Sequence, residues 1–407
     1  MNNKFKTQLQ QKEFLSLKNR DRVILRWATG CGKSKMAIDL INNIVDSKST
    51  TSKVLFVVAE RAHINNWQDE FDKWNLHYNK VATDVVCYAS LHKMQNTPYD
   101  IIVYDEAHHL FTEKRLSIIE NMPASYVFLL SATLPQAKID TIKDIYGNFT
   151  ISTVTLKDAI KKDILSDPRV YVIEMLLDNR IPDQEIKIGN QSNAPTVNWE
   201  ERMKFLSKNL PCKIRCTEQQ KYIHLTNVME YWKQRYERSK NPYHRNLWVN
   251  TGSIRKRFLG ERKTEAVYRM ISRMPKGRRF VCFCASIAQA DALSSTNTIS
   301  SKKTAGKNQF IIWQFNARRI NSIYAVGMIT EGMNLTDIEA GIIVQLDGKE
   351  RLFIQKFGRS MRAQDPVSYI FYFKGTQDEL YLKKALENID AKFIRYININ
   401  QLNAISL

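Results

Sequence analysis

Short apolar segments alternate with helix-length segments along two stretches of this chain. In the first 150 residues, five segments of strand length are rich in β-branched or aromatic residues, and helix-length segments separate most of them. The five segments are residues 22–28, 54–58, 85–88, 101–104 and 126–130. Because a parallel strand needs a long crossover, usually a helix, this alternation predicts a parallel sheet with helices on both faces.

The alternation stops between about 175 and 265 and resumes near Arg279. The intervening stretch is charged and helix-like, most clearly at 199–208 and 218–240, with a polar break at 189–195. Further strands are expected at 280–284, 322–326, 341–345 and 368–372, followed by a helix at 378–387. The sequence therefore predicts an α/β protein with two doubly wound parallel-sheet lobes, residues 1–155 and 261–407, and a linker with a helical insertion at 156–260 between them.

The charge of the chain predicts a polyanionic partner. The 407 residues include 61 Lys and Arg against 41 Asp and Glu, which gives a formal net charge of +20. Such a surface attracts nucleic acid, although a basic surface that only aids solubility is the alternative. Apolar runs of about 18 or more residues are absent, as is an apolar leader, so we expect neither a membrane span nor secretion.

The six cysteines are scattered without disulfide spacing, which indicates a reducing compartment, the cytoplasm. Cys282 and Cys284 lie in an apolar run and are expected to be buried. Cys212 and Cys216 are spaced too loosely for a zinc site, so no structural metal is expected. The Lys-, Asn- and Ile-rich composition suits an AT-rich genome such as that of a phage, and a monomer is compatible with the sequence.

A glycine-rich segment follows the first expected strand and precedes a helical pattern. Glycines let backbone N–H groups turn toward phosphate oxygens, and the helix N-terminus adds positive potential. We expect Lys33 to reach the β- and γ-phosphates and the Ser34 hydroxyl to hold Mg²⁺. Trp27 replaces the first glycine of the strict pattern. The expected nucleotide contacts are Thr29, Gly30, Cys31, Gly32, Lys33 and Ser34.

Two adjacent carboxylates, Asp105 and Glu106, follow the apolar segment 101–104. They are expected at the carboxyl edge of the sheet, beside the glycine-rich segment. There Asp105 would bind Mg²⁺ directly or through water, and Glu106 would orient and deprotonate an attacking water. A solvated turn is the alternative for such a pair by itself, and the preceding glycine-rich segment argues against it.

Residues 105–108 read Asp-Glu-Ala-His, a DEAH box, and together with the glycine-rich segment they resemble the superfamily-two helicases and translocases. The resemblance implies RecA-like lobes, ATP and Mg²⁺ as cofactors, and nucleic acid bound across both lobes. It also implies that His108, Ser131 and Thr133 couple hydrolysis to nucleic-acid movement. For the glutamine that reads adenine in this family, Gln11 fits best and Gln8 is the alternative.

The second half of the chain carries further motifs of the same family. Residues 330–335 resemble the Glu-Gly-Ile-Asp motif, so Gly332 and Asn334 are expected at the nucleotide, with Asn334 in place of the common Asp. Gln355, Arg359 and Arg362 match Gln-x-x-Gly-Arg-x-x-Arg in full. These three are expected to be catalytic, because an arginine from another lobe can stabilise the charge of a γ-phosphate transition state.

The family resemblance also implies nucleic-acid contacts at Arg61, Ser90, Ser286 and Thr330. A basic stretch, residues 253–280, adds ten Lys or Arg against two Glu. Arg255, Lys256 and Arg257 are its candidates for phosphate contacts, and a solvated helix face is the equal alternative. The aromatic residues of the insertion could stack on bases, although a small helical core is the more frequent arrangement.

These motifs predict an enzyme, an ATP hydrolase that acts as a helicase or translocase. DNA is favoured over RNA because the Asn66-Trp67-x-x-Glu70 pattern after Arg61 resembles the DNA translocases of restriction and repair systems. The alternatives are an RNA helicase, or a nucleotide-gated clamp that hydrolyses ATP as a switch without unwinding.

Overall fold

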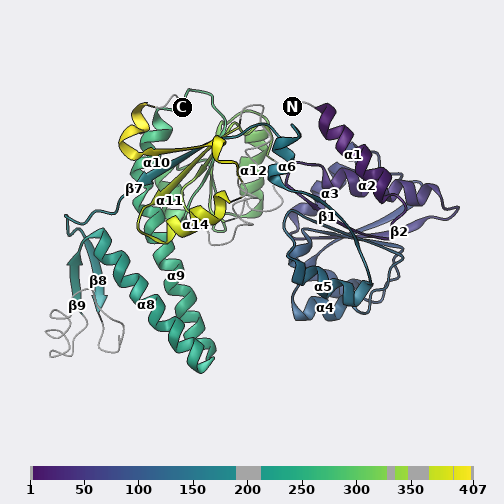
Figure 1. The fold of residues 1–407 in the computed structure, drawn as a ribbon, viewed down its shortest axis with the longest axis horizontal. Coiled ribbons are helices and arrows are strands. Elements are labelled where there is room, and N and C mark those ends of the chain that lie inside the picture. The colour runs from purple at the N-terminus through teal and green to yellow at the C-terminus, as the bar shows by residue number, and fades with distance from the viewer. Residues whose placement is uncertain (1–2, 189–211, 328–334, 347–365, 388, 405–407) are drawn as a thin grey trace.

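The computed structural model describes residues 3–188, 212–327, 335–346, 366–387 and 389–404. Two parallel sheets with helices packed on them form two lobes, and a pair of long helices extends from the second lobe (Figure 1). The predicted α/β fold class of two RecA-like lobes is confirmed. No helix within the described ranges is long and apolar enough to cross a membrane.

The first sheet has six strands in the order β3-β2-β4-β5-β1-β6, and every neighbouring pair is parallel. Its strands are β1 (Arg22–Trp27), β2 (Ser52–Val58), β3 (Val81–Cys87), β4 (Ile101–Asp105), β5 (Tyr126–Ser131) and β6 (Thr150–Val154). The five predicted strands are confirmed. The sequence did not predict β6, because this edge strand alternates buried and exposed positions and lacks the long apolar run of the central strands.

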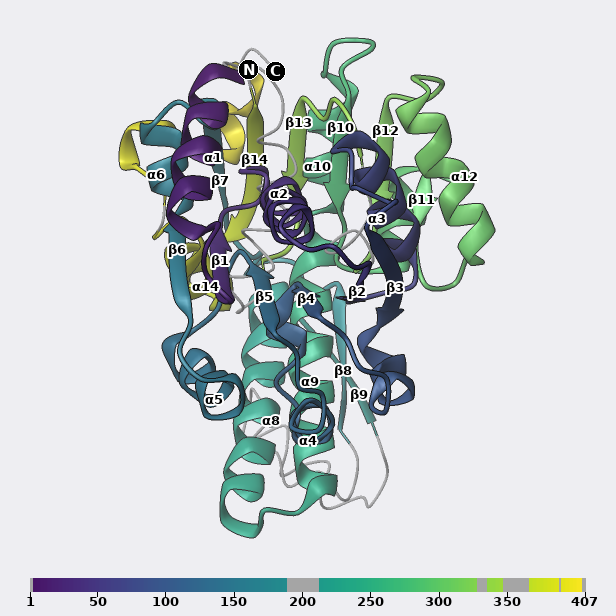
Figure 2. The same ribbon diagram turned by 90° about the vertical axis from the view of Figure 1, so that its right-hand side faces the viewer.

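Helices cover both faces of the first sheet. One face carries α1 (Asn3–Leu17), α2 (Lys33–Asp46) and α3 (Ala62–Lys73), and the other carries α4 (Glu113–Ile119) and α5 (Gln136–Tyr146) (Figures 1 and 2). Each face has its own cluster of buried side chains. Short 3₁₀ turns, η1 (Tyr88–Met94) and η2 (Ala107–His109), follow β3 and β4. After β6, α6 (Leu156–Lys161) leads out of the lobe.

The second sheet has seven strands in the order β11-β12-β10-β13-β14-β7-β15, all parallel. They are β7 (Arg169–Met175), β10 (Phe280–Phe283), β11 (Thr298–Ile299), β12 (Ser322–Ala325), β13 (Ala340–Ile343), β14 (Val367–Phe373) and β15 (Ile394–Asn398). The four predicted strands are confirmed, and both Cys282 and Cys284 are buried as expected. The other elements of this lobe are α10 (Thr264–Ser272), α11 (Ile287–Leu293), α12 (Ala305–Asn316), α14 (Gln377–Leu386), η4 (Ala391–Phe393) and η5 (Ile399–Ala404).

Strand β7 comes from the range 156–260 that was expected to be linker and insertion. It lies between β14 and β15, and its register with β14 runs from Arg169 opposite Val367 to Met175 opposite Phe373. The chain therefore enters the second sheet before it forms the insertion. For this reason the insertion extends from the second lobe, and the predicted limit at residue 261 leaves out one strand of that lobe.

The insertion consists of an antiparallel strand pair, β8 (Gln184–Ile188) and β9 (Cys212–Cys216), and the helices α8 (Glu218–Ser239) and α9 (Pro242–Arg262). The predicted helix 218–240 is confirmed, whereas the predicted helix 199–208 lies outside the described residues. Aromatic rings pair along the two helices: Tyr231 with Trp232, Trp232 with His244, and Tyr236 with Trp248. These aromatic residues thus build contacts within the helix pair.

Candidate nucleotide-binding site

The glycine-rich segment forms a tight loop between β1 and α2. Gly30 and Gly32 have φ of 92° and 96°, in the left-handed region that favours glycine, and Gly32 is the N-cap of α2. A Cβ atom on Gly32 would lie 2.1 Å from the Gln10 Nε2 atom. The loop therefore requires glycine here, and it leads directly into the positive end of a helix.

Helix α1 brings Gln10 to this loop. The Gln10 side chain is buried and donates from Nε2 to the Cys31 carbonyl oxygen at 3.1 Å. Gln11 and Gln8, the residues that the sequence indicated, are both exposed. A one-residue step turns a side chain by about 100° around a helix, which is why neighbouring glutamines face differently. The Cys31 thiol is buried, and burial raises its pKa to about 11, so it serves as a packing group.

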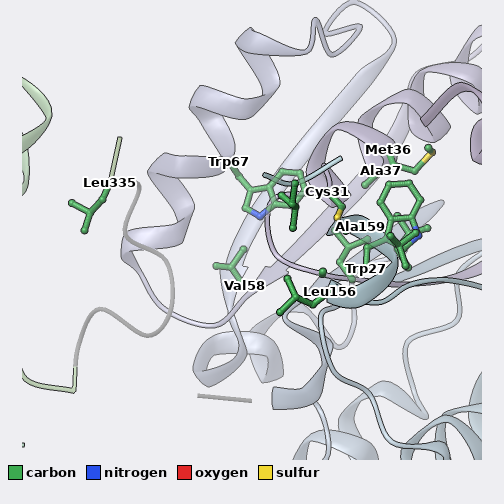
Figure 3. Packing of buried hydrophobic residues seen from close by; sticks show 14 of the residues in the cluster. Trp27, Cys31, Met36, Ala37, Val58, Trp67, Leu156, Ala159 and Leu335 are labelled. Atoms are coloured by element: carbon green, nitrogen blue, oxygen red, sulfur yellow. The ribbon is translucent and has the colours of Figure 1, made fainter. Parts of the chain in front are cut away.

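Trp27, which replaces a glycine of the usual pattern, points away from the loop. Its side chain is fully buried, and its indole N–H donates to the Ser152 hydroxyl at 2.8 Å. Ser152 donates in turn to Glu13 Oε2 at 2.7 Å, which joins β1 to β6 and α1. Figure 3 shows Trp27 among Leu156 and Ala159 of α6. The tryptophan thus fills the core and leaves the loop backbone accessible.

Thr29, Lys33 and Ser34 are half-buried on this loop and the first turn of α2. Lys33 Nζ donates to the Trp27 carbonyl oxygen at 3.0 Å, so its cation lies along the loop. The positive charge of Lys33 also acts on Asp105 and opposes the rise in its pKa. The glycine loop and the acidic pair therefore share one electrostatic environment.

The acidic pair lies at the carboxyl end of β4. Asp105 is held at three points: Oδ1 accepts from the Glu106 backbone N–H at 2.9 Å, Oδ2 from Trp67 Nε1 at 3.0 Å, and the carbonyl from the Tyr88 hydroxyl at 3.0 Å. Burial and the Glu106 charge raise the pKa of Asp105. Glu106 has φ of 46°, a strained backbone conformation for a non-glycine residue of the kind found at functional sites.

The three predicted coupling residues lie together. His108 Nδ1 is 3.4 Å from the Ser131 Oγ atom and 3.4 Å from Glu106 Oε2. The Ser131 hydroxyl donates to the Thr133 carbonyl oxygen at 3.0 Å. A continuous chain of contacts thus leads from the acidic pair after β4 to the turn after β5.

The donor set fits a magnesium–nucleotide complex. A glycine loop at a helix N-terminus suits phosphates, and a hydroxyl with a carboxylate suits Mg²⁺, which prefers oxygen ligands. Ser34 and Asp105 would hold the metal ion, which would neutralise phosphate charge. Gly332, Asn334, Gln355, Arg359, Arg362 and Thr330 lie outside the described residues.

The residues predicted to contact nucleic acid are placed differently from one another. Arg61 is exposed at the start of α3, and Ser90 is half-buried in η1. Ser286 is buried, where it caps α11 and donates to Glu261 Oε1 at 2.8 Å. Ser286 therefore joins α11 to the end of α9 and offers little surface to a ligand.

Within the basic triplet of α9, only part is accessible. Arg255 is buried; its Nη1 donates to Thr226 Oγ1 at 3.1 Å, and its guanidinium lies 5.8 Å from the Tyr222 ring centroid. Arg255 thus packs α9 against α8. Lys256 is half-buried and Arg257 exposed.

Sequence reasoning also missed Trp67 and Tyr88 as neighbours of Asp105, because neither the residue type nor the spacing of a buried hydrogen-bond donor shows which carboxylate it will meet.

Two parallel-sheet lobes, with a glycine loop and an acidic pair at the edge of the first, define the class of RecA-like helicase cores. Sequence comparison agrees with this class. Residues 2–136 match the family model described as "Type III restriction enzyme, res subunit", and residues 262–364 match "Helicase conserved C-terminal domain". Together the two ranges take in more than half of the chain, which belongs to superfamily two of the nucleic-acid helicases and translocases. Among curated proteins, none matches this sequence.

Solved structures show the same fold at low sequence identity. S. cerevisiae Dbp5 bound to RNA and ADP BeF3 is 11% identical, with a TM-score of 0.60 over 97% of this chain and 90% of its own. The Pyrococcus furiosus Hef helicase domain is 13% identical, with a TM-score of 0.50 over 92% and 96%. The type ISP restriction-modification enzyme LlaBIII bound to DNA is 14% identical, with a TM-score of 0.55 over 97% of this chain and 31% of that protein.

Proposed function

We propose that this protein is a nucleic-acid-stimulated ATPase of the DEAH type that moves along or unwinds DNA. The observation that carries the proposal is the continuous contact from Glu106 through His108 to Ser131, beside the Lys33 loop. Such a contact can transmit a structural change at the bound nucleotide to the turn after β5. The proposed lobes are residues 1–155 and 261–407, with β7 added to the second, and the proposed location is the cytoplasm.

The chemistry follows from the arrangement of the chain's own side chains. Lys33 and the N-terminus of α2 would bind the phosphates, and Ser34 and Asp105 would hold Mg²⁺. Glu106 would take the proton of the attacking water. Arg359 and Arg362 would stabilise the charge of the transition state, as arginine residues from a second lobe do in phosphoryl transfer. His108, Ser131 and Thr133 would couple ATP hydrolysis to movement of the bound nucleic-acid strand.

The preference for DNA rests on two similarities. The family model that matches the first lobe is that of a restriction enzyme subunit, and the Asn66-Trp67-x-x-Glu70 pattern after Arg61 resembles DNA translocases of restriction and repair systems. LlaBIII bound to DNA, at 14% identity, and Dbp5 bound to RNA, at 11%, each share only the fold with this chain. RNA is therefore the second substrate to test.

The deciding experiment measures ATP hydrolysis with single-stranded DNA, duplex DNA, forked DNA and RNA, next to a strand-displacement assay on the same substrates. We expect DNA to stimulate hydrolysis and forked DNA to be unwound, with Lys33→Ala inactive in both assays. Stimulation by RNA alone would reassign the substrate. Hydrolysis without displacement of any strand, and without movement along a single strand, would favour a nucleotide-gated clamp.

The position of the basic triplet predicts which of its members contact phosphate. Replacing Lys256 and Arg257 with alanine should weaken binding to all DNA sequences alike and reduce the slope of log affinity against log salt by about 1.4–1.8, since each phosphate contact contributes about 0.7–0.9. Arg255→Ala should instead destabilise the helix pair, because it removes the contacts to Thr226 and Tyr222. Binding measured at several salt concentrations tests this, and an unchanged slope would show that α9 lies off the nucleic-acid path.

A further inference from the structure

Trp67 lies in α3 with its ring held rigidly on several sides. Its side chain is 3% exposed. The centroid of its ring is 4.8 Å from that of Phe56 in β2 and 5.7 Å from that of Phe71 one turn further along α3, and these two phenylalanine rings are themselves 4.7 Å apart. Figure 3 shows Trp67 in the same buried cluster as Val58 and Cys31 of the glycine loop. An aromatic side chain packed in this way has little rotational freedom.

The single polar atom of this ring is directed at the acidic pair. Trp67 Nε1 donates to Asp105 Oδ2 at 3.0 Å, while Asp105 Oδ1 accepts from the Glu106 backbone N–H at 2.9 Å. Each carboxylate oxygen is therefore held by one neutral donor, and the plane of the carboxylate is fixed. A carboxylate has about four lone-pair positions, so each oxygen keeps one for a cation or its water.

We propose that Trp67 is a positioning residue for Asp105, which fixes the carboxylate in the orientation that receives Mg²⁺ with the nucleotide. This inference rests on the proposed function, since it assumes that the site binds a magnesium–nucleotide complex. An indole N–H suits the role because it donates only and carries no charge. It holds the carboxylate without competing with the metal for the negative charge, as a lysine or arginine would.

The test removes the N–H and keeps an aromatic ring at position 67. Trp67→Phe does this with a smaller ring, and β-(3-benzothienyl)alanine placed at position 67 alone retains the shape of the fused ring with sulfur in place of N–H. The matched control is Trp74→Phe, since Trp74 Nε1 donates to Glu70 Oε2 at 2.7 Å rather than to the acidic pair. Binding of N-methylanthraniloyl ATP is titrated by fluorescence with Mg²⁺ and with EDTA, and hydrolysis is followed against Mg²⁺ concentration.

We expect the Mg²⁺ concentration for half-maximal binding and hydrolysis to rise roughly 10–100-fold in both position-67 variants, the range seen when residues that orient a metal ligand are changed. Binding with EDTA should match the wild type, as should the Mg²⁺ dependence of binding and hydrolysis in Trp74→Phe. An unchanged Mg²⁺ dependence in the benzothienyl variant would overturn the proposal. An equal loss of binding with EDTA would also overturn it, because Trp67 would then shape the glycine loop. If the wild type itself bound no magnesium–nucleotide, the proposed function would fail first.

Discussion

Replacing Glu106 with glutamine will leave nucleotide binding intact and lower the rate of ATP hydrolysis by about 10²–10⁴-fold, the usual contribution of a positioned general base. Glutamine keeps the size and the polar end of the side chain and removes the ability to accept a proton. The carboxylate lies 3.4 Å from His108 Nδ1, so the amide can retain that contact and the link to Ser131. Single-turnover hydrolysis and equilibrium binding of ATP, measured on the same preparation, separate the two effects.

Asp144 is exposed in α5, away from the acidic pair. Asp144→Asn is therefore the matched control for the loss of one carboxylate and should hydrolyse ATP like the wild type. A Glu106→Gln variant with near-normal turnover would remove Glu106 from the catalytic role. A parallel loss of ATP binding would place its main effect on the ground state, because an interaction made only in the transition state leaves substrate affinity unchanged.

Replacing Lys263 with methionine will destabilise the second lobe by about 3–5 kcal/mol, the cost of leaving a buried charge without its partner. Lys263 is fully buried between α9 and α10, and Nζ donates to Asp378 Oδ2 at 2.6 Å. It also donates to the carbonyl oxygens of Val344 and Phe371 at 2.9 and 3.0 Å. One ammonium group therefore ties the end of α9 to the residue after β13, to β14 and to α14. Guanidinium unfolding, followed by circular dichroism, measures the loss.

Two further variants isolate the buried pair. Lys374→Met removes the exposed partner of Glu174, 3.5 Å away, and should cost no more than about 1 kcal/mol. Lys263→Met combined with Asp378→Leu should recover part of the stability, because no buried charge is left without a partner, whereas the carbonyl oxygens of Val344 and Phe371 still lose their donor. Equal effects of Lys263→Met and Lys374→Met would show that burial of this pair contributes little.

The central strands and the nucleotide motifs could be predicted from the sequence because their signals are local. A fully buried parallel strand must be apolar along its length, and a phosphate loop must contain glycine where φ is positive. Both requirements act within a few residues of the chain. For this reason the strands β1 to β5 and the positions of Lys33, Asp105 and Glu106 were visible before the fold was known.

The features that the sequence missed depend on partners far along the chain. Strand β7 reads as part of a linker until β14, almost two hundred residues later, supplies its hydrogen bonds. Gln10 and Gln11 are the same residue type, and only the packing of α1 on α2 decides which of them reaches the loop.

Arg255 shows the same limit for charged residues. In the sequence Arg255 belongs to a basic triplet and is a candidate for a phosphate contact. In the structure α8 packs over it, and its side chain forms a contact between the two helices instead. The sequence by itself determined the two parallel sheets and the positions of the glycine loop and the acidic pair, because backbone conformation and burial of strands are set by near neighbours. Tertiary structure alone decided which polar side chains meet, since a hydrogen bond over long sequence separation depends on how whole elements pack.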